Sequence, residues 1–306
     1  MTNSISPLSK PKRLSPGDTI GIAAPAGPYA EHEFEKGLAV IQDMGFRVKV
    51  PENLQLPKGF LAGSDEHRAS LLMDMFTDPT VDAIVCARGG YGSIRILKRL
   101  DWEVVRNHPK IFVGFSDISA LHASLITRAR QAVFHGPMVI SLGKTGNKTR
   151  ASYLQAMTSD QPIAIQPDNP IPICAGQTTG IVAGGNLATL CHLLGTPFAP
   201  IYKDTILLLE DITEAPYKID RMLYQMKLAG CFIGVNGIVL GSFQESGNYL
   251  EICDIVADIF KDKNVPVLAG FEIGHGRENL TIPLGIRATL DTEEGGLTYA
   301  ETATSS

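Results

Sequence analysis

The stretch Ile111-Phe-Val-Gly-Phe-Ser-Asp-Ile118 reads as a short buried strand that turns directly into a helix. Apolar side chains fill its first three positions, and the helical segment that follows runs to Arg128. Toward the N-terminus, three further apolar strands alternate with helical segments. Strands separated by helices of this length predict a parallel sheet that is covered on both faces.

The character of the chain changes near residue 160. Before it, strands are predicted at 19–24, 46–50, 81–87 and 111–114, and helices at 31–44, 66–76, 93–100 and 117–128. Pro162, Pro167, Pro170 and Pro172 follow, and proline neither donates to a sheet ladder nor continues a helix. After them, strands are predicted at 205–209, 238–240 and 265–271, and helices at 186–194, 219–228 and 250–260.

This pattern predicts an α/β protein of two domains, and 306 residues are enough for two cores of ordinary size. We expect a polar tail at 1–12 and a parallel-sheet domain at 13–160. A proline-rich linker or edge segment at 161–178 then leads to a second, mixed β/α domain at 179–306.

Composition and charge narrow the classes of partner. Hydrophobic residues make up 44% of the chain and charged residues 19%, as in ordinary globular proteins. The formal net charge is −5, and no run of Lys and Arg offers the positive surface that nucleic acids or anionic lipids require. No cluster of metal ligands stands out. We therefore expect a small-molecule substrate and no nucleic acid, membrane, metal or cofactor.

The N-terminus and the cysteines favour a cytoplasmic protein. Residues 1–13 lack the apolar segment of a secretory signal, and no apolar run reaches the roughly 18 residues of a membrane-spanning helix. The five cysteines include no Cys-x-x-Cys pair, and most have apolar neighbours in the sequence. They are expected to be buried, reduced thiols.

Ser116 is the first candidate for a catalytic residue. The strand-to-helix turn places its hydroxyl at the carboxyl end of a parallel sheet, where open α/β folds bind ligands. The amide of Asp117 would then lie at a helix N-terminus, where it can face a developing oxyanion. Gly114 allows the backbone to bend. Serine is equally suited to cap the helix, so the local sequence leaves both interpretations open.

A serine nucleophile needs a base, usually a histidine, and His275 is the best placed of the seven. It follows an apolar strand and stands between two glycines that leave its ring unobstructed. His135, before Gly136-Pro137, reads more readily as part of a structural turn. The others lie in polar helical stretches, in a loop or inside helices: His32, His67, His108, His122 and His192.

Glu210 is the candidate partner for such a base. It ends the apolar strand Thr205-Ile-Leu-Leu-Leu-Glu210, and a carboxylate buried there is costly unless it is paired. A hydrogen bond to a histidine would offset that cost and fix the tautomer of the ring. The alternative is a strand end that reaches solvent, which is the simpler interpretation of Asp211.

Two glycine-rich turns follow strands. Arg88-Gly-Gly-Tyr-Gly-Ser93 is neither a Walker loop nor Gly-x-Gly-x-x-Gly, because no Gly-Lys-Ser/Thr follows and Arg95 takes the place of the third glycine. The amides of Gly89 and Gly90 would suit an oxyanion hole as well as a phosphate. Ala183-Gly-Gly-Asn186 is adequately explained by close packing of a helix on the sheet.

Together these motifs resemble the LD-carboxypeptidase family of serine peptidases, which includes the microcin C immunity peptidases. The resemblance covers nearly the whole chain, and the order of the motifs makes it specific. The motifs are Leu14–Gly27, Ala87–Ser93, Gly114–Asp117, His135–Met138, Gly184–Leu187, Leu209–Ile212, Arg221–Leu223 and Gly274–Gly276.

The resemblance implies a function and a set of roles. Ser116 would be the nucleophile, His275 the base and Glu210 its carboxylate partner. The backbone amides of Gly90 and Asp117 would form the oxyanion hole. The family implies a flavodoxin-like N-terminal domain, a C-terminal domain that combines a sheet or barrel with helices, and a homodimer. The implied reaction releases terminal D-alanine from murein tetrapeptides during peptidoglycan recycling.

Rival functions remain. An α/β-hydrolase would have glycine two residues after its serine, where this chain has Ile118. A flavodoxin-like nucleotide-binding module leaves Glu210 and His275 without a role, and a non-catalytic peptide-binding protein would not need all three residues. Within the family, the alternative is a microcin-type immunity peptidase that cleaves aminoacyl sulfamoyl adenylates; a chain of 306 residues is closer in length to the murein-recycling members.

Overall fold

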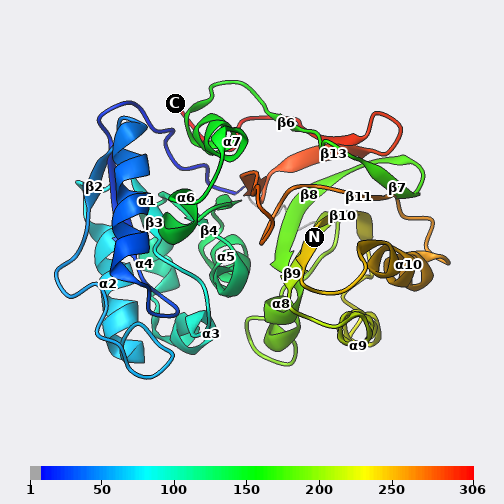
Figure 1. The fold of residues 1–306 in the computed structure, drawn as a ribbon, viewed down its shortest axis with the longest axis horizontal. Coiled ribbons are helices and arrows are strands. Elements are labelled where there is room, and N and C mark those ends of the chain that lie inside the picture. Colours follow the sequence, from blue (N-terminus) through cyan, green and yellow to red (C-terminus); the bar gives the residue numbers. More distant parts are fainter. Residues whose placement is uncertain (1–7) are drawn as a thin grey trace, which may run out of the picture.

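Two β-sheets carry the fold, shown in Figure 1 as a computed structural model that describes residues 8–306. The first sheet has the order β12-β5-β4-β3-β1-β2, and β1 to β5 are parallel. An order of 2-1-3-4-5 is the flavodoxin-like arrangement, which confirms the predicted fold class. The strands are β1 (Thr19–Ala23), β2 (Arg47–Lys49), β3 (Ala83–Cys86), β4 (Ile111–Gly114), β5 (Val133–His135) and β12 (Ile282–Leu284).

Both faces of this sheet are covered. Every residue of β3 and β4 is buried, and successive side chains of a strand point to opposite faces. Ser64 begins one of the covering helices, α2, because its side chain accepts a hydrogen bond from the amide of His67. The helices of this part are α1 (Glu31–Asp43), α2 (Asp65–Thr77), α3 (Ser93–Ile96), α4 (Trp102–Asn107), α5 (Ser119–Ser124), α6 (Val139–Leu142) and α7 (Asn147–Thr158).

The second sheet is mixed, with the order β6-β14-β13-β8-β9-β10-β11-β7. Its central strands β8 to β11 are parallel, and antiparallel strands flank them on both sides. The strands are β6 (Ala164–Ile165), β7 (Ile171–Cys174), β8 (Gln177–Asn186), β9 (Thr205–Ile212), β10 (Val235–Gln244), β11 (Val267–Ala269), β13 (Arg287–Asp291) and β14 (Gly296–Tyr299).

A second apolar core lies between this sheet and its helices. It joins Ile219 and Leu223 of α9 (Pro216–Leu228) and Val256 of α10 (Tyr249–Phe260) to strand residues such as Leu207 and Ile238. Burial of such side chains, at about 25 cal/mol for each Å² of apolar surface, stabilises the pairing of helices and sheet. Figure 1 shows α9 and α10 together on one side of β10 and β11.

The proline-rich segment 161–178, expected to be a linker or an edge segment, supplies β6 and β7, the two edge strands of the second sheet, where missing amide donors are tolerated. Other segments differ from the sequence-based expectations. The predicted glycine turn at 183–186 is the end of strand β8. Of the predicted tail, residues 1–7 lie outside the described part. Ser9 is not loose, because its amide donates to Arg130 O at 2.7 Å.

The two sheets meet where α5 packs against β8 and α8 (Leu187–Leu193), at the centre of Figure 1. The amide of Asn186 donates to Ser119 Oγ at 2.9 Å across this contact. A Cβ on Gly185 would lie 2.4 Å from the same oxygen, so only glycine permits the approach. The ends of β4 and β9 are thereby held close together. None of the helices within residues 8–306 combines the length and apolar character that crossing a membrane requires.

Candidate active site

Ser116 occupies a tight turn between β4 and the helical segment that follows. Its φ is +64°, a left-handed conformation that is uncommon for residues other than glycine and is a form of strain often found at functional sites. The side chains of Phe115 and Asp117 are buried, whereas Ser116 is partly exposed. A Cβ on Gly114 would lie 2.6 Å from Ile118 Cγ2, which explains the glycine there. The turn therefore presents one hydroxyl to the surface.

The glycine turn after β3 lies against this hydroxyl. A Cβ on Gly89 would be 3.2 Å from Ser116 Oγ, so the bare glycine backbone lies beside the serine. Gly90 has a φ of +101°, and within residues 8–306 no group accepts a hydrogen bond from its amide. Asp117 Oδ2 accepts a hydrogen bond from the amide of Ser93 at 2.8 Å. The carboxylate thus fixes the glycine turn relative to the serine turn.

Glu210 and His275 form a hydrogen-bonded pair in the second part of the chain. Glu210 lies near the end of β9, and His275 lies in the loop after β11. His275 Nδ1 is 2.7 Å from Glu210 Oε2, and the glutamate side chain is fully buried while that of His275 is 14% exposed. A Cβ on Gly274 would lie 2.3 Å from Glu210 Oε2 and one on Gly241 3.1 Å from Glu210 Cβ. Two glycines thus make room for the carboxylate.

The electrostatics of the pair favour its charged form. Burial alone would raise the pKa of Glu210, but the charge and hydrogen bond of His275, together with the neighbouring His135, outweigh it and lower that pKa to about 2. Burial would lower the pKa of His275, but the charge and hydrogen bond of Glu210 prevail and raise it. An ionised carboxylate only accepts hydrogen bonds, so the proton of a neutral His275 ring lies on Nδ1. Its Nε2 is then free to accept a proton.

Phe115 connects the serine turn with the histidine pair. Its ring centroid lies 4.8 Å from that of His275, and both residues line one pocket. The structure therefore brings all five sequence-predicted site residues to one region, where the carboxyl ends of the parallel strands of both sheets meet. Gly90, Ser116 and Asp117 lie in turns that follow β3 and β4 of the first sheet. Glu210 lies in β9 of the second sheet, and His275 lies in the loop after β11.

His135, expected to be part of a structural turn, lies behind Glu210. It is fully buried at the end of β5, and its Nε2 is 3.9 Å from Glu210 Oε1, the oxygen that His275 does not contact. His122, also buried, lies next to His135 with ring centroids 6.2 Å apart. Burial and then the neighbouring His135 lower the pKa of His122 well below its ordinary value. The sequence signal was limited to an apolar segment before His135 and Gly136-Pro137 after it; the structure shows that His135 ends β5, opposite Gly114 of β4.

Asp211 is not the solvent-reaching strand end that the sequence suggested. It is 2% exposed, and its carboxylate accepts hydrogen bonds from Ala188 N at 2.8 Å and Asn186 Nδ2 at 3.0 Å. Burial and the neighbouring charge of Glu210 raise its pKa to about 6. Asp211 therefore anchors the start of α8 beside the site.

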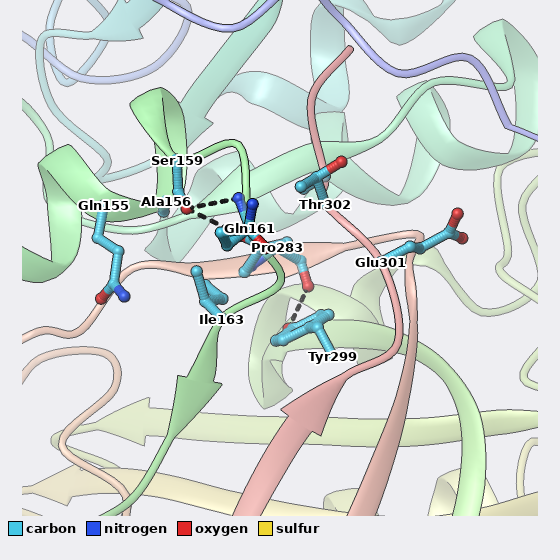
Figure 2. A pocket seen from close by; sticks show the side chains of 10 residues that line it. Gln155, Ala156, Ser159, Gln161, Ile163, Pro283, Tyr299, Glu301 and Thr302 are labelled. Atoms are coloured by element: carbon cyan, nitrogen blue, oxygen red, sulfur yellow. Dashed lines mark hydrogen bonds between the residues drawn. The ribbon is translucent and has the colours of Figure 1, made fainter. Parts of the chain in front are cut away.

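One open pocket has His275 in its lining, and a second is lined by the next residues, Gly276 and Arg277. A further small hollow lies away from the site. Figure 2 shows this hollow, between α7, β14 and the C-terminal segment, where Tyr299 Oη donates to Pro283 O at 2.6 Å. Its volume of about 10 Å³ holds at most a water molecule. Among residues 8–306, no three His, Cys, Asp or Glu side chains are grouped so that they could hold a metal ion.

Comparisons with known proteins agree with this architecture. The family model of the LD-carboxypeptidase N-terminal domain matches residues 20–136, and that of the LD-carboxypeptidase C-terminal domain matches residues 179–290. A probable murein peptide carboxypeptidase of Bacillus subtilis is 36% identical, over 93% of this chain and 92% of its own. The microcin C7 self-immunity protein MccF of Escherichia coli is 27% identical over 94% of each chain. The solved structure of muramoyltetrapeptide carboxypeptidase from Oxalobacter formigenes superposes with a TM-score of 0.81 at 29% identity, over 92% of this chain and 97% of its own.

Proposed function

The chain belongs to the LD-carboxypeptidase family of serine peptidases, and from this premise we propose that it releases terminal D-alanine from murein tetrapeptides. The observation that carries the proposal is the pairing of His275 with Glu210 beside the strained turn of Ser116. A nucleophile, a base and an orienting carboxylate in one region form the arrangement that acyl transfer needs.

The proposed first step is attack by Ser116. His275 Nε2 takes the hydroxyl proton while Ser116 Oγ forms a bond to the carbonyl carbon, and the carbonyl oxygen becomes an oxyanion. The amides of Gly90 and Asp117 stabilise that oxygen. One such donor is typically worth about 10² to 10³ in rate.

The second step releases the amino acid. The tetrahedral carbon expels the amine as the C–N bond breaks, and the proton on His275 Nε2 passes to the departing nitrogen. Water then gives a proton to His275 while its oxygen attacks the acyl carbon. The second tetrahedral carbon expels Ser116 Oγ, which takes that proton from His275, and the shortened peptide leaves as a free acid. Throughout, the ionised Glu210 holds the ring by Nδ1 and stabilises the imidazolium form.

The choice of substrate rests on the names of relatives. The B. subtilis relative and the O. formigenes structure are both named for murein peptides. The alternative is an activity on aminoacyl sulfamoyl adenylates, supported by the resemblance to the E. coli self-immunity protein. We further propose that the enzyme acts in the cytoplasm and that it is a homodimer. Light scattering after size-exclusion chromatography measures the oligomeric state directly.

The deciding experiment compares the wild type with Ser116→Ala on both substrate classes. The peptides are murein tetrapeptides with lysine or diaminopimelate at the third position, and the other substrate is an aminoacyl sulfamoyl adenosine. We expect D-alanine release by the wild type and a loss of about 10⁴-fold or more in the variant. Ser159→Ala, which removes a hydroxyl at the distant hollow of Figure 2, is the matched control.

Each outcome has a distinct meaning. Turnover of the adenosine derivative alone would replace the murein assignment by the alternative. D-Alanine release that survives Ser116→Ala, with unchanged thermal unfolding, would refute the role of Ser116.

A further inference from the structure

We propose that the pocket beside His275 binds the terminal carboxylate of the substrate and that Arg277 supplies the decisive charge. We call it the carboxylate pocket; it is lined by Phe115, Lys144, His275, Arg277 and Asn279, among others. This inference rests on the proposed function, because it concerns recognition of the amino acid that leaves.

The chemistry of the leaving group determines where such a pocket must lie. The base that protonates the departing amine must be within hydrogen-bond reach of that nitrogen. In an amino acid, the carboxylate carbon is only two bonds from the amine. The terminal carboxylate of a bound substrate must therefore lie close to His275, and the carboxylate pocket has His275 in its wall.

The lining of the pocket carries unneutralised positive charge. Arg277 is exposed, and no acidic group within residues 8–306 pairs with it. Lys144 adds a second cation, although Glu33 lies 2.5 Å from its Nζ and neutralises part of its charge. Arginine offers a planar array of donors that matches a carboxylate, whereas lysine acts as a point charge. Arg277 is therefore the stronger candidate.

Asn279 supplies an independent sign of a ligand. It is 3% exposed, and its Oδ1 accepts a hydrogen bond from Gly274 N at 2.9 Å. Its Nδ2 is buried and has no acceptor within the described residues. A buried donor without a partner is costly, and the proposal assigns it an acceptor on the substrate bound in the pocket that Asn279 lines.

The second pocket near the histidine is unsuited to an anion. It is lined by Glu245, Glu272 and Glu278 together with Arg277, and Gly276 and Arg277 separate it from the carboxylate pocket. Three carboxylates against one cation would repel a terminal carboxylate. This acidic pocket is also larger, with a volume of about 470 Å³ compared with about 200 Å³. The smaller pocket lies below the roughly 300–1,000 Å³ of sites for drug-sized ligands, in keeping with one small amino acid.

The test measures kcat/KM on two peptides that differ only at the terminus, a tetrapeptide acid and its C-terminal amide. The wild type should prefer the acid, and Arg277→Gln should lower kcat/KM for the acid by about 10- to 100-fold, as expected for a lost charge-assisted hydrogen bond. The same variant should leave the amide unchanged, and Arg277→Lys should restore part of the preference. Arg47→Gln, at an exposed arginine on β2, is the matched control and should behave as the wild type.

The outcomes separate this inference from the proposed function. If Ser116-dependent release of D-alanine is observed but Arg277→Gln keeps the preference for the acid, the carboxylate pocket is wrong and the proposed function stands. If the wild type releases neither D-alanine nor its amide, the proposed function fails and this inference fails with it. An equal loss on both peptides would also overturn it, because Arg277 would then act on something other than the carboxylate.

Discussion

His275 Nδ1 lies 2.7 Å from Glu210 Oε2, although 65 positions separate the two residues in the chain. Glu210 is fixed within a central strand, while His275 stands on a loop between glycines. The rigid, buried carboxylate therefore orients a ring whose backbone has more freedom. This relationship determines which ring nitrogen carries the proton, and it sets the pH range in which His275 is a base.

The pH dependence of the reaction should reflect the raised pKa of His275. Only the neutral ring accepts the Ser116 proton, so kcat/KM should rise with pH through an apparent pKa above 6.5 and then level off. Glu210, with a pKa of about 2, stays ionised over this range and should add no second limb. The measurement is kcat/KM for D-alanine release at constant ionic strength.

Glu210→Gln tests the cause of that shift. The variant removes the negative charge and leaves the burial of His275, which on its own lowers the pKa of the ring. The midpoint should move to lower pH, and the plateau should fall by about 10² to 10⁴ because the tautomer and the imidazolium lose their support. A midpoint that stays in place would show that Glu210 does not control the base.

Much of the fold could be predicted from local patterns. The strands around Ile84 and Phe112 are short apolar runs that end in glycine-rich turns, and such signals belong to single segments. The sequence left the segment of β6 and β7 open between a linker and an edge segment, because prolines obscure the periodicity and edge strands tolerate proline. Strands β5 and β12 were missed because each has only three residues, too few for a periodic signal.

The candidate site was predictable in parts. Glu210 was recognisable as a carboxylate that continues an apolar strand, and His275 as a histidine between glycines. Their roles, however, came from resemblance to a family. The position of His135 behind Glu210 could not be predicted, because it depends on how β5 and β9, from different sheets, approach each other. Asp211 was misjudged for the same reason, since its partners lie at the end of β8 and the start of α8.

His135→Phe should weaken catalysis through Glu210. The phenyl ring keeps much of the buried volume but removes the nitrogen 3.9 Å from Glu210 Oε1, and with it one influence that lowers the pKa of Glu210. At 3.9 Å the two atoms are in electrostatic contact and not hydrogen-bonded, so we expect kcat to fall by about tenfold at most, with KM little changed. The midpoint of the pH profile should shift as well, which a loss of packing alone would not cause.

His122→Phe is the matched control for this prediction. His122 is equally buried and lies next to His135, but it has no contact with Glu210. It should change thermal stability without moving the pH profile. Identical profiles for the two variants would mean that His135 serves only the packing of the core.

Gly274→Ala should disable the enzyme by displacing Glu210. The added Cβ would lie 2.3 Å from Glu210 Oε2, and the φ of +103° strains any residue with a side chain, at a cost of about 1 to 3 kcal/mol in the free energy of unfolding.

Gly45→Ala separates the contact with Glu210 from the backbone strain, because Gly45 has a φ of +92° and no atom within 4 Å of its Cβ position. Both variants should lose stability in chemical denaturation, but only Gly274→Ala should lose D-alanine release. The backbone of Glu210 is held in a central strand, so the contact should turn its carboxylate away and break its hydrogen bond to His275. The pH midpoint of any residual activity should then fall, as it does in Glu210→Gln. Wild-type kcat in Gly274→Ala, alongside equal destabilisation of both variants, would show that the contact between Glu210 and His275 tolerates a shift of this size.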